Sequence, residues 1–291
     1  MEDARVGRVA LAGRLRRGDP GRAAILLHGL GGSAESAYLA PIERALGARG
    51  WTTLRLHLRG ADGSGADLYH AGFTADLPHV LSAPPFGDAD EIALVGISLG
   101  GHVALRFAAE GAAPRVAAVA AVCAPLDLEL GARALDAPAA WLYRRHVLRG
   151  LNEVYRRVAE RRAVPVPYER VRRARGIREW DGLAVVPRFG FASAEDYYAR
   201  ASVAPLLAGI RIPAWIVVSE ADPMVPPETV RPALARVSPS TEVTWTRRGG
   251  HVGFPADVDL GRGGEPGLAA QLASWLETAA AGSSLSGSSA R

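Results

Sequence analysis

The sequence L-V-G-I-S-L-G-G at residues 94–101 places one serine, Ser98, between two kinds of predicted secondary structure. The aliphatic run at residues 92–95 predicts a buried strand, and the apolar spacing of residues 102–109 predicts a helix. G-x-S-x-G in this context is typical of a nucleophile elbow, a turn so tight that its serine is held in a strained backbone conformation. Side chains two positions before and after the serine would collide, and both positions are glycine. The alternative is a glycine-rich turn with an ordinary exposed serine, and the strand–helix context favours the nucleophile.

The rest of the chain predicts strands and helices in alternation. We expect strands at residues 6–15, 23–27, 51–56, 91–95, 116–121, 214–219 and 242–246. Helices are expected from Ser33 or Ser36 to residue 50, and at 74–81, 102–110, 227–236 and 268–280. This order predicts right-handed crossovers. The expected fold class is therefore α/β, with a mostly parallel central sheet and helices on both of its faces.

The alternation stops at about residues 129–200, where no strand pattern occurs and arginine-rich amphipathic segments carry many aromatic side chains. We interpret this segment as a mainly helical cap, inserted into a core of about residues 6–128 and 201–281. Residues 1–281 then form a single domain. The serine- and glycine-rich residues 282–291 are expected to be a disordered tail.

Composition indicates a globular protein without a membrane span. The chain has 291 residues, of which 48% are hydrophobic and 22% charged, which allows a large packed core. No apolar run reaches the roughly 20 residues that a transmembrane helix needs, and the first residues do not resemble a signal peptide. The single cysteine, Cys123, excludes an internal disulfide and is expected to be a small buried hydrophobic residue. These features together favour a cytoplasmic protein.

The formal net charge is +4, and all 34 basic residues are arginine. Arginines cluster at residues 144–178. One interpretation is a surface for anions, such as lipid head groups, with peripheral membrane contact. The other is a solvated helical face, because glutamates such as Glu153, Glu160 and Glu169 are interspersed, and this is the commoner case. No zinc-finger spacing or aromatic–basic pattern indicates nucleic-acid binding.

A nucleophilic serine needs a base, and the base needs an orienting acid. In doubly wound hydrolases the chain order is serine, acid, histidine. Asp222 fits the acid because it follows the strand expected at residues 214–219 and precedes prolines that fix its loop. Glu220, closer to the strand end, and Asp127, after an earlier strand, are the competing candidates.

His251 is the histidine that follows the last expected strand, in a loop with glycines around it, so it is the predicted base. The predicted oxyanion donors are the backbone N–H groups of Leu99, at the start of the elbow helix, and Leu30, in the H-G-L-G-G loop at residues 28–32. His28 and His57 end strands and are expected to hydrogen-bond the loops of the site. The glycine loop lacks the spacing of a phosphate or dinucleotide site, and this chemistry needs no metal or organic cofactor.

Several segments together resemble the YheT-type α/β-hydrolases, a family of carboxylesterases related to the α/β-hydrolase-domain esterases and lipases of animals and plants. The matching segments are residues 27–33, 57–60, 69–72, 96–101, 124–128, 190–198, 221–223 and 249–254. The resemblance implies an α/β-hydrolase fold. It also implies Ser98, Asp222 and His251 as nucleophile, acid and base, in agreement with the assignment from the residues.

The expected function is hydrolysis of a small-molecule carboxylic ester through an acyl-enzyme, with short- or medium-chain acyl esters or monoacylglycerol-like lipids as the substrates that the resemblance implies. A thioesterase or amidase of the same fold is one alternative. A fold that only binds a ligand is the other, and an intact Ser, Asp and His argue against it. Nothing in the sequence indicates an oligomeric state.

Overall fold

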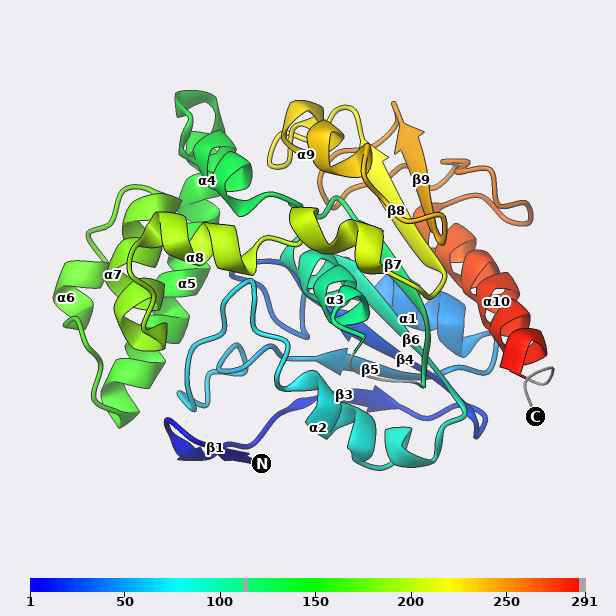
Figure 1. Cartoon of the computed structure of the whole chain (residues 1–291), viewed down its shortest axis with the longest axis horizontal. Helices are drawn as coiled ribbons and strands as arrows, with labels where there is room; N and C mark the ends of the chain where they lie inside the picture. Colours follow the sequence, from blue (N-terminus) through cyan, green and yellow to red (C-terminus); the bar gives the residue numbers. More distant parts are fainter. Residues whose placement is uncertain (112–114, 288–291) are drawn as a thin grey trace.

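A seven-stranded sheet in the order β3-β5-β4-β6-β7-β8-β9 runs through the middle of the molecule (Figure 1). The structure is a computed structural model and describes residues 1–111 and 115–287. Neighbouring strands pair in parallel, except that β3 pairs antiparallel with β5. The strands of this sheet are β3 (Gly13–Arg16), β4 (Arg22–Leu27), β5 (Thr52–Leu56), β6 (Glu91–Ile97), β7 (Val116–Val122), β8 (Ala214–Ser219) and β9 (Thr241–Thr246).

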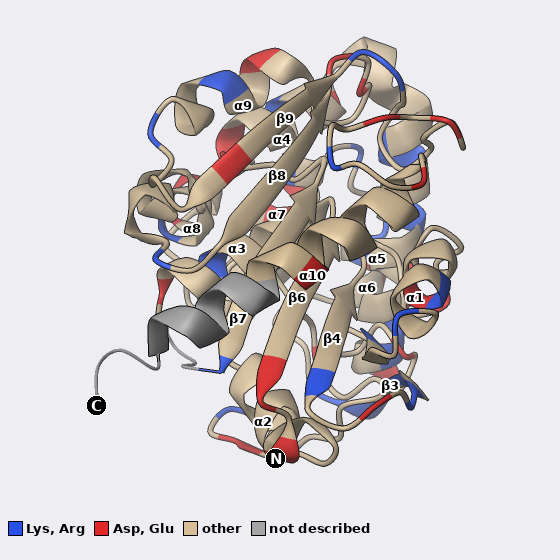
Figure 2. Cartoon of the chain, turned by 90° about the vertical axis from the view of Figure 1, so that its right-hand side faces the viewer, with Lys and Arg blue, Asp and Glu red and all other residues tan. Residues whose placement is uncertain are grey.

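Helices cover both faces of this sheet. On one face, α1 (Leu39–Gly47) and α10 (Leu268–Gly287) pack against the strands through one apolar cluster. Figure 2 shows α10 lying across the strands. On the other face, α2 (Leu77–Ser82) and α3 (Leu99–Ala109) contribute to a second, larger cluster. The helix α9 (Pro227–Leu234) lies between β8 and β9 in the chain, and a 3₁₀ turn, Phe86–Asp88, precedes β6. The predicted fold class is confirmed.

The central strands are buried on both sides, which explains their nearly continuous apolar sequence. In β6, Leu94 belongs to the cluster under α3, and the next residue, Val95, belongs to the cluster under α10. Figure 2 shows the central strands with almost no charged residues along their length. Each such side chain contributes about 1.5–3 kcal/mol by leaving water, so β6 is fixed firmly in the sheet. The elbow at its end therefore stands on a rigid base.

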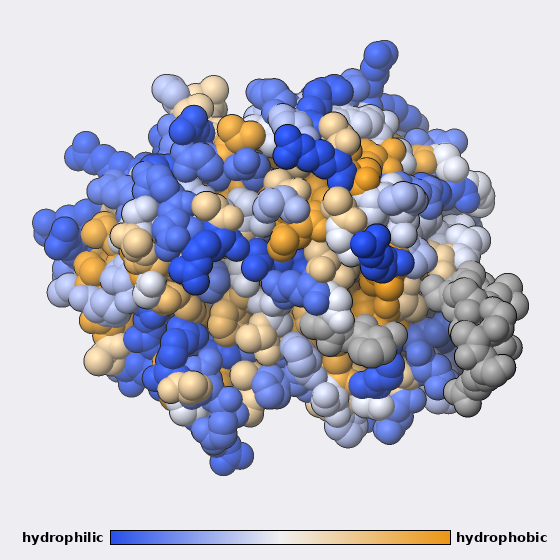
Figure 3. Space-filling model, viewed as in Figure 1, coloured by the Kyte–Doolittle hydropathy of each residue, from blue (hydrophilic) through white to orange (hydrophobic). Residues whose placement is uncertain are grey.

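The cap between β7 and β8 is mainly helical, as the sequence predicts. It comprises α4 (Leu128–Asp136), α5 (Trp141–Arg161), α6 (Tyr168–Val171), α7 (Ile177–Phe189) and α8 (Ala194–Ala201), with 3₁₀ turns at Pro138–Ala140 and Ala204–Gly209. These helices gather at one end of the molecule, on the left in Figure 1. The same end in Figure 3 carries hydrophilic side chains with apolar ones between them. Within the described ranges, no helix has both the length and the apolar character that crossing a membrane requires.

Two predictions near the N-terminus differ from the structure. The strand expected at residues 6–15 is divided into β2 (Gly7–Arg8), which pairs with β1 (Glu2–Asp3), and β3. Between them, the backbone of Val9 hydrogen-bonds to Met1 and leaves the sheet. The helix expected to start near Ser33 or Ser36 begins only at Leu39, because residues 33–36 form a turn closed by a hydrogen bond from the Ser36 N–H to the Ser33 carbonyl.

The disordered tail expected at residues 282–291 is a wrong prediction for its first part. Helix α10 continues to Gly287, whereas the sequence predicted its end at residue 280. Once a helix is formed and packed, each further residue adds a backbone hydrogen bond without a new nucleation cost. Glycine and serine oppose this by only about 1 kcal/mol or less per residue. Residues 288–291 lie outside the described residues.

Candidate active site

Ser98 lies at the turn between β6 and α3 with φ 55° and ψ −123°, a left-handed conformation that is strained for a residue with a side chain. The glycines on either side are required by different neighbours. A Cβ at Gly96 would lie 2.1 Å from the carbonyl carbon of Gly100, within the elbow itself. A Cβ at Gly100 would lie 2.2 Å from the carbonyl oxygen of Leu27, in the adjacent strand β4. The elbow is therefore tight both internally and against the sheet.

Asp222 and His251 form a buried hydrogen-bonded pair. His251 Nδ1 lies 2.8 Å from Oδ2 and 3.0 Å from Oδ1 of Asp222. Asp222 Oδ1 also accepts the backbone N–H groups of Met224 and Val225, at 2.8 and 2.9 Å. The carboxylate is thus fixed by its own loop. In this geometry it holds the proton of the imidazole on Nδ1 and leaves Nε2 as the free acceptor.

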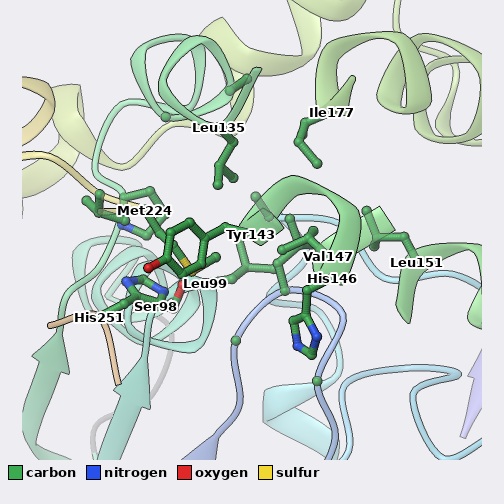
Figure 4. Close-up of a pocket in the computed structure, with 18 of the residues that line it drawn as sticks. Ser98, Leu99, Leu135, Tyr143, His146, Val147, Leu151, Ile177, Met224 and His251 are labelled. Carbon is green, nitrogen blue, oxygen red and sulfur yellow. The ribbon is translucent and has the colours of Figure 1, made fainter. Parts of the chain in front are cut away.

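Ser98 and His251 both line a cavity of about 660 Å³. Figure 4 draws them at one end of this cavity, with cap side chains such as Leu135 and Ile177 around the rest. Both residues are described, and no hydrogen bond joins them in this structure. Contacts of this kind in unliganded enzymes are often long and tighten when substrate binds.

The two competing acids lie elsewhere. Glu220 is exposed and pairs with Arg247 at 3.3 Å. Asp127 caps the N-terminus of α4, where its carboxylate accepts the Leu130 N–H. Of the three candidates from the sequence, the structure brings only Asp222 to His251.

The glycine loop after β4 passes directly beside Ser98. A Cβ at Gly29 would lie 3.1 Å from the Ser98 Cβ, a tight contact that would force the loop or Ser98 to shift by a few tenths of an ångström. The Gly29 N–H donates to the Tyr38 hydroxyl at 2.9 Å, and the Gly31 N–H donates to the Tyr69 hydroxyl at 2.8 Å.

These bonds leave the N–H of Leu30, between the two glycines, without a partner among the described residues. Leu99 is the first residue of α3, where N–H groups have no acceptor within the helix. Both predicted oxyanion donors therefore belong to segments that meet at Ser98.

His28 and His57 fix the loops of the site, as the sequence predicts. His28 Nδ1 lies 2.8 Å from the Gly29 carbonyl oxygen, and its Nε2 accepts the Leu58 N–H at 3.1 Å. Burial lowers the pKa of His28 to about 4, so this ring is neutral at pH 7. His57 Nδ1 accepts the Ala34 N–H at 3.3 Å.

Cys123 is buried, as predicted. It also lies next to Asp222, a position that the sequence did not predict. It follows β7 with φ 49°, and its ligand atom lies within 4.8 Å of those of Asp222 and His251. Burial, with the Asp222 carboxylate beside it, raises the pKa of this thiol well above its usual range. A protonated thiol is neither a nucleophile nor a good metal ligand. The sequence signal for this position was that Cys123 directly follows a strand, and so lies at the carboxyl edge of the sheet, where the site is built.

The walls of the cavity are mainly apolar and aromatic. The cap and the loop after β8 supply Leu128, Leu135, Val147, Leu151, Ile177, Trp180 and Met224. The tyrosines of the sequence segment 190–198 also line it. The Tyr197 hydroxyl accepts the Ala71 N–H at 3.0 Å, and the Tyr198 hydroxyl donates to Asp181 at 2.7 Å. This segment therefore joins the cap to the core at the site.

The arginine-rich segment contains both kinds of surface that the sequence allowed. Arg156 and Arg157 on α5 pair with Glu153 and Glu160, as expected for a solvated face. A groove along the N-terminal half of α5 is also lined by Glu153, yet three of its arginine side chains have no carboxylate partner within the described part of the chain. These are Arg145, Arg149 and Arg175.

Comparison with known proteins agrees with this geometry. The alpha/beta hydrolase family matches this chain over residues 24–259. YheT of Escherichia coli (strain K12), which is named as an esterase, is 32% identical over 87% of this chain and 76% of its own length. The human phospholipase ABHD3 is 25% identical, and the monoacylglycerol lipase of Saccharomyces cerevisiae is 26% identical. The chain spans only 58% and 55% of the lengths of these last two proteins.

Solved structures show the same fold at low identity. The monoacylglycerol lipase of Paleococcus ferrophilus superimposes with a TM-score of 0.55 at 18% identity, over 93% of this chain and 100% of that one. The Pyrococcus furiosus esterase Pf2001 gives a TM-score of 0.52 at 19% identity, over 83% of this chain and 78% of that one. The family match and the extended similarity to YheT establish that the chain belongs to the alpha/beta hydrolase family.

Proposed function

We propose that the protein is a serine hydrolase that cleaves carboxylic esters with Ser98, His251 and Asp222 as its catalytic triad. The observation that carries this proposal is the strained Ser98 at the wall of a 660 Å³ cavity that His251, held by Asp222, also lines. The names of the relatives, which include an esterase, a phospholipase and a monoacylglycerol lipase, support the reaction type.

In the proposed mechanism the Ser98 hydroxyl attacks the ester carbonyl carbon while His251 Nε2 takes its proton. Asp222 stabilises the imidazolium that forms. The N–H groups of Leu30 and Leu99 donate to the oxyanion, and each such donor typically contributes about 3–4 kcal/mol in the transition state. The tetrahedral intermediate then expels the alcohol, which takes the proton from His251. Water, activated by the same histidine, releases the acid from the acyl-enzyme.

The cavity supports a substrate with an apolar acyl chain of short or medium length, or a monoacylglycerol-like lipid. Its aliphatic cap residues, among them Leu135, Val147 and Ile177, would bury such a chain, with Ser98 and His251 at one end of the cavity (Figure 4). A thioester or an amide carbonyl fits the same constellation. A role in ligand binding alone would not require the strained backbone of Ser98.

The test is a panel of p-nitrophenyl esters of increasing acyl length, with a matched thioester and anilide. We expect ester hydrolysis by the wild type and a loss of about 10⁵-fold in kcat for Ser98→Ala. The control is Ser82→Ala, which removes an exposed hydroxyl on α2 bound only to the Pro78 carbonyl. A fluorophosphonate probe should label the wild type and the control. Hydrolysis or labelling that persists in Ser98→Ala would refute the proposal, and faster thioester or anilide cleavage would change the substrate class.

We also propose that the cap touches anionic membrane surfaces. Trp141 and Leu142, at the start of α5, are 52% and 58% exposed, which is unusual for large apolar side chains. They lie beside the groove that holds Arg145 and Arg149. Apolar side chains that enter a bilayer next to arginines that attract anionic lipids are typical of interfacial binding. Tyr143, the next residue, lines the cavity, so this surface adjoins the cavity that contains Ser98.

A further inference from the structure

Asp181 is a buried carboxyl group that the proposed triad does not use. It belongs to α7 and lines the same cavity as Ser98, with 8% of its surface exposed. Its hydrogen-bond partner is the Tyr198 hydroxyl, which donates to Oδ2 at 2.7 Å. Oδ1 has no partner among the described residues. Of the residues that line the cavity, Asp181 is the one carboxylic acid, and no arginine is among them.

Three other buried aspartates in the described ranges each have a basic partner. Asp67 pairs with Arg188 at 2.8 Å, Asp76 pairs with Arg59, and Asp222 pairs with His251. Asp181 has no such partner within the described part of the chain, although the sequence contains 34 arginines. A buried carboxylate usually requires a cation or several hydrogen-bond donors. The charge of Asp181 is therefore not balanced by the protein, and it faces the cavity where a substrate would lie.

The surroundings of Asp181 make it responsive to a positive charge. Burial raises the pKa of its carboxyl to about 7, against the hydrogen bond from Tyr198, and the charge of Asp136 acts in the same direction as burial. Asp136 itself is engaged at the start of α7, where it accepts the N–H groups of Ile177 and Arg178. A cation beside Asp181 would favour the ionised form and gain the full attraction of a poorly solvated charge.

Aromatic residues line the same cavity. Trp180, Tyr197 and Tyr198 are in its lining together with Asp181, and the Arg178 guanidinium, outside the lining, lies 5.8 Å from the centre of the Tyr198 ring. Aromatic faces attract ammonium groups, and quaternary ammonium ions in particular are bound by sets of such rings. A carboxylate among aromatic residues, without an arginine in the lining, is complementary to a cation with an apolar surface.

We propose that Asp181 binds the cationic part of the substrate, so that the enzyme prefers esters that carry an ammonium group. This inference rests on the proposed function in that it places the ammonium ester at Ser98. The inference makes Asp181 a specificity residue. It also accounts for the hydrogen bond from the Tyr198 hydroxyl, which holds the carboxylate in place.

The first experiment measures charge discrimination in turnover. Butyrylcholine is compared with 3,3-dimethylbutyl butyrate, its uncharged isostere, and the p-nitrophenyl ester of 4-(trimethylammonio)butyrate with that of 5,5-dimethylhexanoate. The two pairs place the charge in the alcohol and in the acyl part. We expect kcat/KM to favour the cationic ester at least tenfold in one pair, and this ratio to fall towards one in Asp181→Asn. The matched control Glu160→Gln removes an exposed cap charge on α5 and should keep the wild-type ratio.

The second experiment measures binding without catalysis. Titration calorimetry compares butyrylcholine and its isostere on Ser98→Ala and on Ser98→Ala/Asp181→Asn, with thermal melting to verify that both fold. We expect the cationic ester to bind at least tenfold more tightly to the first variant, and equally with its isostere to the second. Absence of discrimination in both experiments, or discrimination that survives Asp181→Asn, would overturn the inference. Failure of turnover with intact binding discrimination would instead refute only the proposed hydrolase function.

Discussion

Two residues at the cavity hold conformations or charges that cost folding free energy. Ser98 has a left-handed backbone, and Asp181 is a buried carboxyl without a basic partner among the described residues. Each such feature typically costs about 1–3 kcal/mol and persists only where the surrounding structure enforces it. Their location in one cavity is typical of a functional site, because stability is lost there in favour of binding and catalysis.

The raised pKa of Asp181 predicts a pH-dependent stability difference for Asp181→Asn. In the unfolded chain the carboxyl ionises near its ordinary pKa of 3.8, whereas in the folded protein its pKa is about 7. The folded state therefore binds more protons between these values, and the stabilising contribution of Asp181 falls as the pH rises towards 7. Asparagine does not titrate. Between pH 5 and pH 7, the free energy of unfolding of the variant should rise by about 2 kcal/mol relative to that of the wild type. Above about pH 8 this difference should stay constant.

This difference is measured by urea unfolding at pH 5, 6, 7 and 8. The exposed loop residue Asp62, replaced by asparagine, provides the matched control. A stability difference for Asp181→Asn that is the same at every pH would show that this carboxyl ionises normally in the folded protein.

At the level of elements, the oxyanion loop depends on hydroxyl groups from outside it. Tyr38 and Tyr69 accept the N–H groups of Gly29 and Gly31, so the backbone on both sides of Leu30 is fixed in the loop that passes Ser98. Tyr69 is buried, and burial raises the pKa of its phenol, which keeps the hydroxyl neutral. We propose that these tyrosines are positioning residues, which would act on the oxyanion through the backbone of the loop.

Replacing Tyr69 by phenylalanine should therefore lower kcat with little effect on KM. The change leaves the Gly31 N–H without an acceptor and releases the loop, at a cost of about 1–3 kcal/mol, or roughly 5- to 150-fold in rate. Steady-state kinetics on p-nitrophenyl butyrate separate the two constants. Tyr168→Phe, on α6 and away from the cavity, is the control. An increase in KM alone would mean that Tyr69 contacts the substrate and does not position the oxyanion loop.

At the scale of the whole molecule, the cap combines an apolar edge with an uneven distribution of arginines. The arginines of α5 near its C-terminal end pair with glutamates, whereas Arg145, Arg149 and Arg175 border the groove next to the exposed Trp141 and Leu142. Net charge alone does not distinguish these arrangements. If the cap contacts a membrane as proposed, the face that approaches it would be the one where arginines lack carboxylate partners.

We expect the protein to float with vesicles that contain phosphatidylserine and much less with purely zwitterionic vesicles. Arg145→Gln/Arg149→Gln should weaken this binding, because each basic residue near an anionic surface contributes about 1 kcal/mol. Arg156→Gln/Arg157→Gln, which removes the same charge from the glutamate-paired face, is the control and should bind like the wild type. Binding that is insensitive to salt, or equal losses in both double variants, would exclude this surface.

The sequence by itself determined the fold class. Period-two and continuous apolar runs mark strands, 3.6-residue spacing marks helices, and the alternation of the two leaves a mostly parallel sheet as the outcome. It also determined the segments from which the site is built, because Ser98, Asp222 and His251 each follow a strand that ends at the same edge of that sheet. Local pattern was sufficient here, since parallel strands bring their carboxyl ends together whatever the loops contain.

Only the tertiary structure decided the contacts between distant segments. It placed Asp222, and neither Glu220 nor Asp127, against His251, because a loop residue's direction depends on its own backbone hydrogen bonds. It placed Cys123 behind the acid and left Asp181 in the cavity without a basic partner among the described residues. Charge pairing between residues far apart in the chain leaves no periodic signal. The strained elbow at Ser98 could therefore be located from its sequence, whereas the shape and charge of the cavity beside it came from packing.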